Sequence, residues 1–519
     1  MATRLRLADL LAGLSTVADM GYGLPQGHAL RSCLIGVGLA RRLGLPDPEI
    51  ADTFYASMLV HVGCVGFSHE MYAAFGDEMA ANRAGAKTNF ADPKDIVATL
   101  IPETMRGLPP SARVGAAAFI LTHGRALGRR YDTTVCEVGR ETARRLGLSE
   151  GVQRALYEVK EHWKGGGAPR GLKGEQILLP ARIARVAAEA ALFDYVGGSE
   201  MVVPALRRRA GGLLDPAVVA ELLVRVPEVL DEVRTWDPRE LVLAAEPDPV
   251  VEKELAELPN VAAAFGDLAD LKSTFTHGHS RNVARLAKTG AQRLGLEAGA
   301  IEMLEVAAAL HDLGRVGISD AIWEKPGPLD AVEWEQVRLH PYYSERILSK
   351  SQALVPVATI AGMHHERLDC SGYHRGCGAG QITISARVLA AADAFQAMTE
   401  HRPHRAALDS ADAATELRRA ARDGELDPEA VACVIEAAGL QRGPRRELRP
   451  AGLSEREVEV LRLVARACSN REIGQQLHIS PRTAEHHVQH IYTKLGLSSR
   501  SALALYAMEH DLLPPSRDS

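Results

Sequence analysis

The 519-residue sequence predicts an all-α protein built from several domains. Three observations support this prediction. The chain is too long for one hydrophobic core, so two to four domains are expected. Only 5% of its residues are aromatic, whereas good helix formers such as Ala, Leu, Arg and Glu are abundant. In several segments the apolar residues also recur at helical spacing.

The composition is that of an ordinary globular protein, with 46% hydrophobic and 24% charged residues. A net charge of −6 does not indicate a nucleic acid or a membrane surface as partner of the whole chain. The seven cysteines are scattered and form no C-x-x-C pair, which is typical of reduced thiols. Because neither a signal peptide nor a long apolar run is present, we expect a cytoplasmic protein without a membrane partner.

One helical unit occurs twice in the chain. The segments GHALRSCLIGVGLARRLGL (27–45) and GHSRNVARLAKTGAQRLGL (278–296) open with Gly-His and close with Arg-Leu-Gly-Leu. Each leads to a second amphipathic helix that ends at a histidine, His61 in the first copy and His311 in the second. Two copies are expected rather than a solenoid, whose period would be roughly 20–50 residues.

The two copies differ in their polar residues. The second has the pair His311-Asp312 where the first has His61 followed by a valine, and Asp393 where the first has Ala188. The adjacent histidine pair of the second copy has a single histidine as its counterpart. We therefore predict that the first copy is a degenerate repeat that serves packing, sensing or dimerisation.

Seven histidines and aspartates of the second copy lie on separate segments with apolar flanks: His279, His311, Asp312, His340, His364, His365 and Asp393. A single histidine near an apolar face is usually a hydrogen-bonded core or surface residue. Burying seven such groups without compensation would cost several kcal/mol each. Divalent metal ions supply that compensation, and imidazole with carboxylate suits Fe, Mn or Zn. The pattern predicts a metal site.

Residues 277–405 resemble the HD-GYP subgroup of the HD phosphohydrolase superfamily. The matching strings are GHSRNVA, HDLGRVGISDAIWEKPGPL, LHPYYSERIL, HHERLDCSGYHRG and ARVLAAADAFQAMTEHRPHR. The resemblance implies that the seven residues above bind the metals and that the chain hydrolyses cyclic di-GMP. It also implies catalytic roles for His311, Asp312 and Arg315. The substrate-binding residues implied by the resemblance are Arg315, Gly372, Tyr373, Arg402 and Arg405.

Two departures from the family pattern refine these expectations. Phe275 stands where trinuclear members carry Glu, so two divalent metal ions are expected, with Fe or Mn favoured and Zn possible. His374 replaces the proline of the Gly-Tyr-Pro triplet. Cyclic di-GMP is favoured as substrate, and another cyclic nucleotide or phosphoester stays open.

The C-terminal segment 453–513 predicts four helices after a Pro/Arg-rich linker. Ser454 and Glu457 form a capping box for the first, and Asn470 is expected to cap the second (470–477). Ser480-Pro481 opens the third, and the fourth runs from Ser499. A short helix, a tight turn and a polar-faced helix predict a helix-turn-helix. The strings LSEREVEVLRLVA, SNREIGQQLHIS and RTAEHHVQHIYTKLGLSSR closely resemble the LuxR/NarL-type DNA-binding domain.

This resemblance implies that the third helix contacts double-stranded DNA through Arg482, Thr483, His486, His487, Gln489, His490 and Lys494. Residues 451–519 carry eight basic and eight acidic residues, so a single copy is expected to bind DNA weakly and a homodimer more tightly. The alternative is a module that makes protein contacts only.

The predicted domains are a degenerate repeat (1–215), a connecting helical segment (216–270), a phosphodiesterase domain (271–440), a linker (441–452) and a DNA-binding domain (453–519). We expect a metal-dependent phosphodiesterase for a cyclic dinucleotide that is coupled to transcription regulation. One alternative is a catalytically weak regulator that senses the nucleotide. Another is a phosphohydrolase for a different phosphoester, with the C-terminal module as a dimerisation unit.

Overall fold

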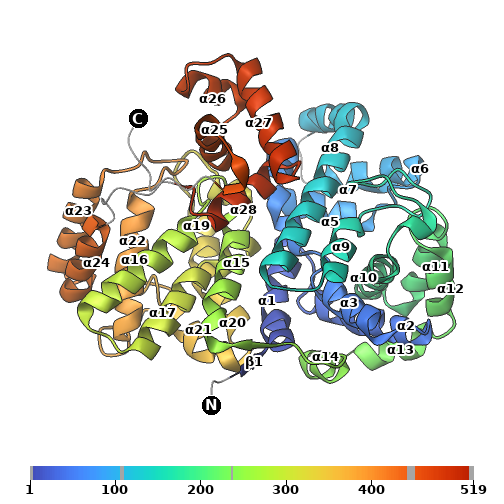
Figure 1. The fold of residues 1–519 in the computed structure, drawn as a ribbon, viewed down its shortest axis with the longest axis horizontal. Coiled ribbons are helices and arrows are strands. Elements are labelled where there is room, and N and C mark those ends of the chain that lie inside the picture. The colour runs from blue at the N-terminus through green and yellow to red at the C-terminus, as the bar shows by residue number, and fades with distance from the viewer. Residues whose placement is uncertain (1–3, 106–109, 235–237, 441–449, 514–519) are drawn as a thin grey trace. The chain divides into compact units, whose positions relative to one another are not determined.

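The computed structural model describes residues 4–105, 110–234, 238–440 and 450–513, and it confirms the all-α prediction (Figure 1). The chain divides into two compact units, Met1–Glu254 and Leu255–Ser519. The finer domain boundaries stay predictions, and residues 441–449 of the predicted linker lie outside the described residues.

The first unit is a helical assembly with one short two-stranded sheet, in which β1 pairs antiparallel with β2. Its elements are β1 (Arg4–Arg6), α1 (Leu7–Tyr22), α2 (His28–Arg42), α3 (Asp47–Met58), η1 (Val62–Phe67), α4 (Ser68–Phe75), α5 (Glu78–Lys87), α6 (Pro93–Asp95), η2 (Ile96–Leu100), α7 (Ile101–Thr104), α8 (Pro110–Arg145), α9 (Glu150–Glu158), η3 (Gly174–Gln176), α10 (Leu179–Gly197), α11 (Ser199–Arg209), α12 (Pro216–Leu223), α13 (Val226–Val233), α14 (Arg239–Ala245) and β2 (Glu252–Glu254).

The second unit contains the second repeat and the C-terminal helices. Its elements are η4 (Leu255–Glu257), α15 (Leu258–Asp270), α16 (His279–Leu294), α17 (Ala298–Leu310), η5 (Leu313–Gly317), α18 (Asp320–Trp323), α19 (Ala331–Arg338), α20 (His340–Leu348), η6 (Gln352–Leu354), α21 (Val355–Ala361), α22 (Ile384–Met398), α23 (Ser410–Arg422), α24 (Pro428–Leu440), η7 (Pro450–Gly452), α25 (Glu455–Ala465), α26 (Asn470–Gln476), α27 (Pro481–Leu495) and α28 (Arg500–Glu509).

The two repeats begin in the same way. The glycine before α2 and the glycine before α16 both have φ of +82°, a left-handed conformation that favours glycine. An aspartate on the preceding helix then accepts a hydrogen bond from the new helix. Asp19 accepts from the amide of Ala29 at 3.1 Å, and Asp270 accepts from the amide of Ser280 at 2.9 Å. The internal repeat seen in the sequence is therefore a structural repeat.

Just after α3 in the first unit and α17 in the second, the backbone passes very close to the backbone of another segment. A Cβ atom added to Gly63 would lie 2.0 Å from the carbonyl oxygen of Val135, and one added to Gly314 would lie 2.1 Å from the carbonyl oxygen of His340. Only glycine fits at such a contact. The two glycines thus occupy equivalent positions, and Val135 is the counterpart of His340.

This register corrects the pairing of histidines predicted from the sequence. Counting back from the two glycines places His61 opposite Asp312 and Val60 opposite His311. The turn hydrogen bonds agree, because the carbonyls of His61 and Asp312 each accept from the amide three residues later at 3.0 Å. The sequence comparison had paired His61 with His311. The equivalent glycines shift this pairing by one residue, so that His61 corresponds to Asp312.

The later part of the repeat is also equivalent in the two units. Glu161 accepts a hydrogen bond from the amide of Arg170 at 2.7 Å, and Glu366 accepts one from the amide of Arg375 at 2.7 Å. The helices that follow, α10 and α22, begin at the same spacing from these glutamates. This spacing places Ala188 opposite Asp393, in agreement with the pairing predicted from the sequence.

The four C-terminal helices form as predicted, from α25 to α28. The capping box of Ser454 and Glu457 is present. A second capping box, of Ser469 and Glu472, starts α26, so the cap of this helix is Ser469 and not Asn470 as predicted. A Cβ atom on Gly474 would lie 2.7 Å from the carbonyl oxygen of Ile479, which keeps the turn between α26 and α27 tight. A helix-turn-helix results.

Among the described residues, no single helix is both long enough and apolar enough to cross a membrane. The segments Asp47–Met58 and Val62–Phe75 satisfy the length and composition test only as a pair, with a bend of 42° between them.

We predict that Gly314→Ala destabilises the fold by about 1–3 kcal/mol or more, since the added Cβ would overlap the His340 carbonyl. Thermal unfolding followed by circular dichroism should show a lower Tm. Gly327→Ala is the matched control, because nothing lies within 4 Å of its Cβ position, and a change within about 0.5 kcal/mol is expected. Equal melting temperatures for the two variants would contradict the close contact.

Candidate functional site

The second unit brings the seven predicted metal ligands together from separate elements. His279 starts α16, His340 starts α20, and Asp393 lies in α22. The His311-Asp312 pair joins α17 to η5, and the two adjacent histidines follow α21. All seven are buried except His365, which is half-buried. They form three overlapping groups, in each of which the candidate ligand atoms lie within 4.8 Å of one another.

Three of these imidazoles are oriented by the same hydrogen bond. Each donates its Nδ1–H to the carbonyl three residues earlier, His311 to Ala308 at 2.7 Å, His340 to Val337 at 2.6 Å and His364 to Ala361 at 2.6 Å. Because Nδ1 carries the proton, Nε2 of the neutral ring carries a lone pair. Histidines that bind metals are commonly fixed in this way.

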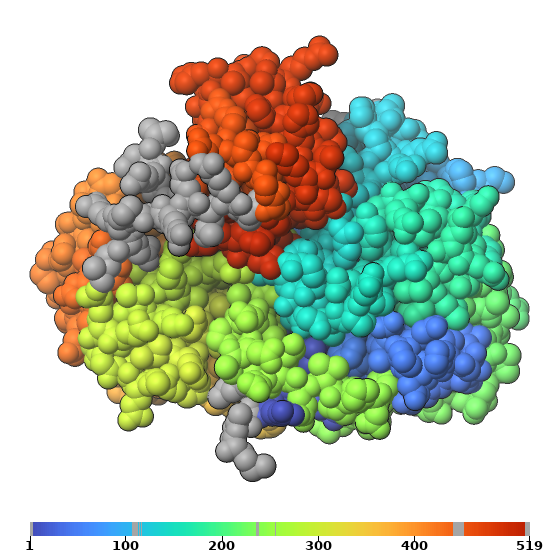
Figure 2. Space-filling model, in the orientation of Figure 1, coloured from blue at the N-terminus to red at the C-terminus, as the bar shows by residue number. Residues whose placement is uncertain are grey.

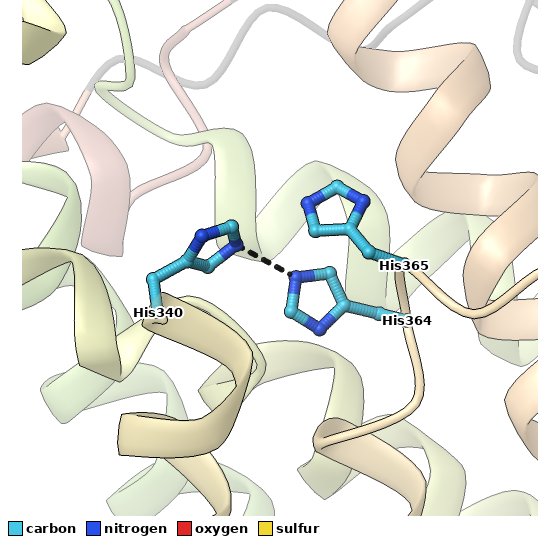
Figure 3. A group of neighbouring side chains, drawn as sticks. All are labelled: His340, His364 and His365. Atoms are coloured by element: carbon cyan, nitrogen blue, oxygen red, sulfur yellow. Dashed lines mark hydrogen bonds between the residues drawn. The ribbon is translucent and has the colours of Figure 1, made fainter. Parts of the chain in front are cut away.

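The lone pairs of these rings face one another. Nε2 of His340 and Nε2 of His364 are 3.1 Å apart (Figure 3). Burial lowers the pKa of His340 to about 4 and the pKa of His364 to about 3, so neither ring supplies a proton between the two nitrogens. Nε2 of His311 has no hydrogen-bond partner in the described part of the chain. Such facing lone pairs suit a shared cation, so the residues present fit a metal ion.

Asp312 lies between two sets of histidines. Its Oδ1 is 3.4 Å from Nε2 of His340, and its Oδ2 is 3.6 Å from Nε2 of His311 and 3.7 Å from Nε2 of His279. Burial raises the pKa of this carboxyl, but His311 and Arg315 outweigh burial and hold the pKa well below its usual range. An ionised carboxylate with one oxygen toward each set of histidines would help to hold divalent metal ions in this cluster.

Asp393 completes the other side of the cluster. Its Oδ1 is 3.2 Å from Nε2 of His279 and 3.7 Å from Nε2 of His311, and its Oδ2 is 3.8 Å from Nδ1 of His365. Its pKa is also well below the usual range, because the effect of His279 and His311 outweighs burial. Two carboxylates and five imidazoles provide hard and borderline ligands for a divalent transition metal.

Glu400 supports the cluster, and the sequence did not predict it. Its Oε2 accepts the Nδ1–H of His279 at 2.9 Å. Burial lowers the pKa of His279, but Glu400 and Asp393 outweigh burial and raise it to about 10. Nη2 of Arg402 also donates to Glu400, at 2.9 Å. The sequence does show a glutamate in TEHRPHR, seven residues after the last predicted ligand, Asp393. Only the fold shows that this glutamate contacts His279.

Arg315 lies beside the cluster with its guanidinium 4.0 Å from the centre of the Trp323 ring. Its Nη1 donates to Oδ2 of Asp312 at 3.0 Å. Trp323, whose Nε1 donates to the carbonyl of Arg315 at 3.2 Å, was not singled out in the sequence. The stacking and the ion pair together orient the guanidinium, and its predicted role in binding substrate phosphate stays a prediction.

The loop after α21 brings Gly372 and Tyr373 to the site. A Cβ on Gly372 would lie 2.4 Å from the amide nitrogen of Arg367, so this position requires glycine. The Tyr373 ring lies 4.7 Å from the ring of His365. Glu366 holds the loop by accepting hydrogen bonds from two of its amides. Close packing against Arg367 is therefore enough to explain why position 372 is glycine, whether or not this residue contacts substrate.

The two arginines of HRPHR hold the end of α22. Arg402 is paired with Glu400, and the guanidinium of Arg405 donates to the carbonyls of Ala397 and Met398 at 2.7 and 2.9 Å. These contacts satisfy several of their donors within the protein. Their predicted contacts with substrate phosphates stay predictions.

The polar face of α27 carries the residues predicted to contact DNA. Figure 2 shows the surface of the C-terminal helices in red. Six of the predicted residues are exposed and His487 is half-buried, the exposed ones being Arg482, Thr483, His486, Gln489, His490 and Lys494. Val488 and Ile491 are buried on the opposite face. Lys494 forms an ion pair with Glu457 at 2.7 Å, which holds it at the end of the helix.

Comparison with protein families identifies two regions of the chain. The HD domain family matches residues 136–195 and 264–430, and the luxR family of bacterial regulatory proteins matches residues 451–507. The first match includes a segment of the degenerate repeat, in agreement with the structural equivalence of the two copies.

Two curated proteins illustrate the similarity. The 3'3'-cGAMP-specific phosphodiesterase 3 of Vibrio cholerae is 32% identical over 437 residues, which are 84% of this chain and 95% of that protein. The cyclic di-GMP phosphodiesterase of Thermotoga maritima is 38% identical over 154 residues, or 29% of this chain and 40% of that protein. Among solved structures, a cyclic GMP-AMP-specific phosphodiesterase from V. cholerae is 29% identical with a TM-score of 0.58, covering 85% of this chain and 99% of that one.

We predict that Glu400→Gln weakens Mn²⁺ binding about 10–100-fold, because the neutral amide no longer raises the basicity of His279. Calorimetric titration of the apo-protein with Mn²⁺ measures this change. Glu416→Gln is the control, since 45% of the Glu416 side chain is exposed on α23. If Glu400→Gln and the control bind Mn²⁺ equally, Glu400 does not support the metal.

Proposed function

Because this chain belongs to the family of HD-domain phosphodiesterases and carries a C-terminal LuxR-family helix-turn-helix domain, we propose that it hydrolyses a cyclic dinucleotide with two divalent metal ions and binds DNA. The observation that carries the proposal is the facing pair of Nε2 atoms of His340 and His364, with Asp312 beside them. The His/Asp clusters are those of a metal centre, and Fe or Mn is the proposed metal.

The proposed chemistry divides between the metals and the chain. When bound, divalent ions would lower the pKa of a water molecule and polarise a phosphodiester oxygen. The three carbonyl-bound imidazoles would hold the ions through Nε2, and Asp312 would add its carboxylate oxygens. Arg315 can donate two parallel N–H groups to a phosphate once its ion pair with Asp312 opens. We propose that Tyr373, whose ring lies beside that of His365, contacts a base or sugar of the substrate.

The proposed substrate is 3'3'-cGAMP. The relative that matches this chain over 95% of its own length, including the degenerate repeat, is named for that substrate. The sequence favoured cyclic di-GMP, and the relative named for it matches over 40% of its length. Cyclic di-GMP is therefore the second candidate.

We predict that the double variant His311→Ala/Asp312→Ala lowers hydrolysis of 3'3'-cGAMP by about 1,000-fold or more, since several kcal/mol of charge stabilisation are lost with the metals. Chromatography of linear dinucleotide and mononucleotide products, after anaerobic purification, measures the rate. His401→Ala, an exposed histidine after α22, is the control and should keep the wild-type rate.

A competition experiment with equal 3'3'-cGAMP and cyclic di-GMP decides which substrate is preferred. Metal-loaded protein that binds these nucleotides without forming product would contradict the enzymatic proposal and support the nucleotide-sensing regulator. Protein that carries no Fe, Mn or Zn would contradict the metal centre itself.

The C-terminal domain is proposed to act as a dimer on double-stranded DNA. In a helix-turn-helix the second helix lies in the major groove of DNA, and α27, which follows α26 after a tight turn, has the polar face suited to this contact. Within the second unit, Nδ1 of His277 lies 2.7 Å from the carbonyl oxygen of Ala465, at the end of α25. His277 is two residues from His279 of the cluster, and we propose that nucleotide at the metal centre changes DNA affinity through this contact.

We predict that Arg482→Ala weakens binding to a fluorescent 30-base-pair duplex and reduces the slope of log K against log salt by about 1, because one phosphate contact is lost. Fluorescence anisotropy at several salt concentrations measures both quantities. Arg418→Ala, an exposed arginine on α23, is the control. The same titration with and without 3'3'-cGAMP tests the coupling, which is absent if the affinity does not change.

A further inference from the structure

The structural register shows what replaced the metal ligands in the first unit. Only the first histidine is kept, as His28, and the six other positions of the cluster are now Val60, His61, Val135, Val159, Lys160 and Ala188. Among the described residues of this unit, no group of three His, Cys, Asp or Glu side chains lies close enough to hold a metal ion. The first unit therefore has the scaffold of the metal centre with different chemistry.

Most of the replacements are apolar and pack together. Val60, Val159 and Ala188 form one buried cluster with Cys136. Val135 packs in a second cluster with Tyr22 and Cys64. Side chains that would bind metal in the second unit are thus replaced by a hydrophobic lining.

A large cavity of about 680 Å³ occupies this same place. Its walls include His28, Val60, His61, Val159, Lys160 and Ala188, which are six of the seven counterparts of the metal ligands. Pockets that bind small organic ligands typically have volumes of about 300–1,000 Å³. The cavity is therefore large enough for an organic molecule and is equivalent in position to the site of the second unit.

Two buried polar side chains on the cavity wall have no partner in the described structure. Neither ring nitrogen of His28 and neither amide atom of Asn82 makes a hydrogen bond, although each residue is only 2% exposed. Both residues line the cavity. Since buried polar groups are almost always hydrogen-bonded, these atoms indicate polar atoms of a ligand.

The charge on the cavity wall selects an anion. Lys160 is 7% exposed, and its Nζ lies 5.8 Å from the centre of the Tyr22 ring and 5.7 Å from that of Tyr131. No carboxylate forms an ion pair with Lys160 within the described ranges. The wall holds five Lys and Arg side chains, namely Arg125, Arg129, Lys160, Lys164 and Arg185, against the two carboxylates of Asp132 and Glu189. Burial raises the pKa of Asp132 to about 6 although Lys160 acts to lower it. The buried ammonium and the excess of cationic side chains on the wall therefore favour a negative ligand.

The remainder of the wall is hydrophobic. Phe75, Ile96, Leu100 and Ile120 line it from η2, α8 and the end of α4. Leu121, which also lines the cavity, is 66% exposed, so the cavity reaches the surface beside it. Aliphatic and aromatic walls of this kind fit a hydrocarbon chain and offer few groups to read the edges of a nucleotide base.

We propose that the first unit binds an apolar organic anion of the medium-chain fatty acid class. The carboxylate would lie at Lys160, His28 and Asn82, and the hydrocarbon chain would lie along Ile120 and Leu100. The site is separate from the metal centre, so the proposal goes beyond the phosphodiesterase function and does not depend on it.

Calorimetric titration of the full-length protein with decanoate tests the proposal, with decanol and decyltrimethylammonium as probes that share the chain and lack the negative charge. We expect one decanoate bound per chain, at least tenfold tighter than either control probe. No binding of decanoate, or equal binding of decanol, would overturn the proposal. Displacement of decanoate by 3'3'-cGAMP would overturn it in favour of a nucleotide site.

Two variants locate the bound anion. Lys160→Met removes the ammonium at nearly constant volume, and Ile120→Trp fills the cavity; each should weaken decanoate binding at least tenfold. Lys94→Met and Val224→Trp are the matched controls, at exposed positions outside the cavity wall, and should bind like the wild type. Unchanged binding in both cavity variants would place decanoate elsewhere and overturn the proposal. Should a variant fail to fold, the comparison of the three probes on the wild type still decides.

Discussion

The metal centre depends on one repeated hydrogen bond, from the Nδ1–H of an imidazole to the carbonyl three residues earlier. This bond fixes the tautomer of His311, His340 and His364 and points Nε2 of each into the same space. Each histidine stands at a helix end, where the carbonyls of the last turn lack helical partners. The last turns of α17, α19 and α21 supply these carbonyls, and each histidine follows within three residues, His340 as the first residue of α20.

The scaffold that brings these helix ends together is independent of the metal. Gly63 and Gly314 permit equivalent close backbone contacts in the two units. Asp19 and Asp270 accept hydrogen bonds from the first turns of the equivalent helices α2 and α16. Glu161 and its counterpart hold the later loop in both units. Because these contacts involve backbone groups, side chains on the inner wall can change without loss of the fold. The two units show the result, a polar metal centre in one and a mainly hydrophobic cavity in the other.

The exchange of His365 for Lys160 illustrates how the chemistry of the two sites differs. In the second unit, His340, His364 and His365, whose pKa values are lowered by burial, lie beside two ionised carboxylates and favour cations. In the first unit, the carboxylate positions are occupied by His61 and Ala188, and an ammonium is buried instead. The ligands proposed for the two sites are therefore of opposite charge on the same scaffold, an apolar anion in the first unit and metal cations in the second.

The helical fold, the internal repeat, the seven histidines and aspartates of the cluster and the helix-turn-helix could all be predicted from the sequence. These features follow from helical spacing, from turn residues and from residue types that are costly to bury singly. The other features depend on contacts between distant segments of the folded chain. Glu400 reaches His279 across 121 positions of the chain, and a close contact at Gly63 sets a register that matching histidines obscured. The empty space beside Lys160 depends on side chains from several helices. Contacts and cavities of this kind arise from packing between distant segments, which local sequence patterns do not record.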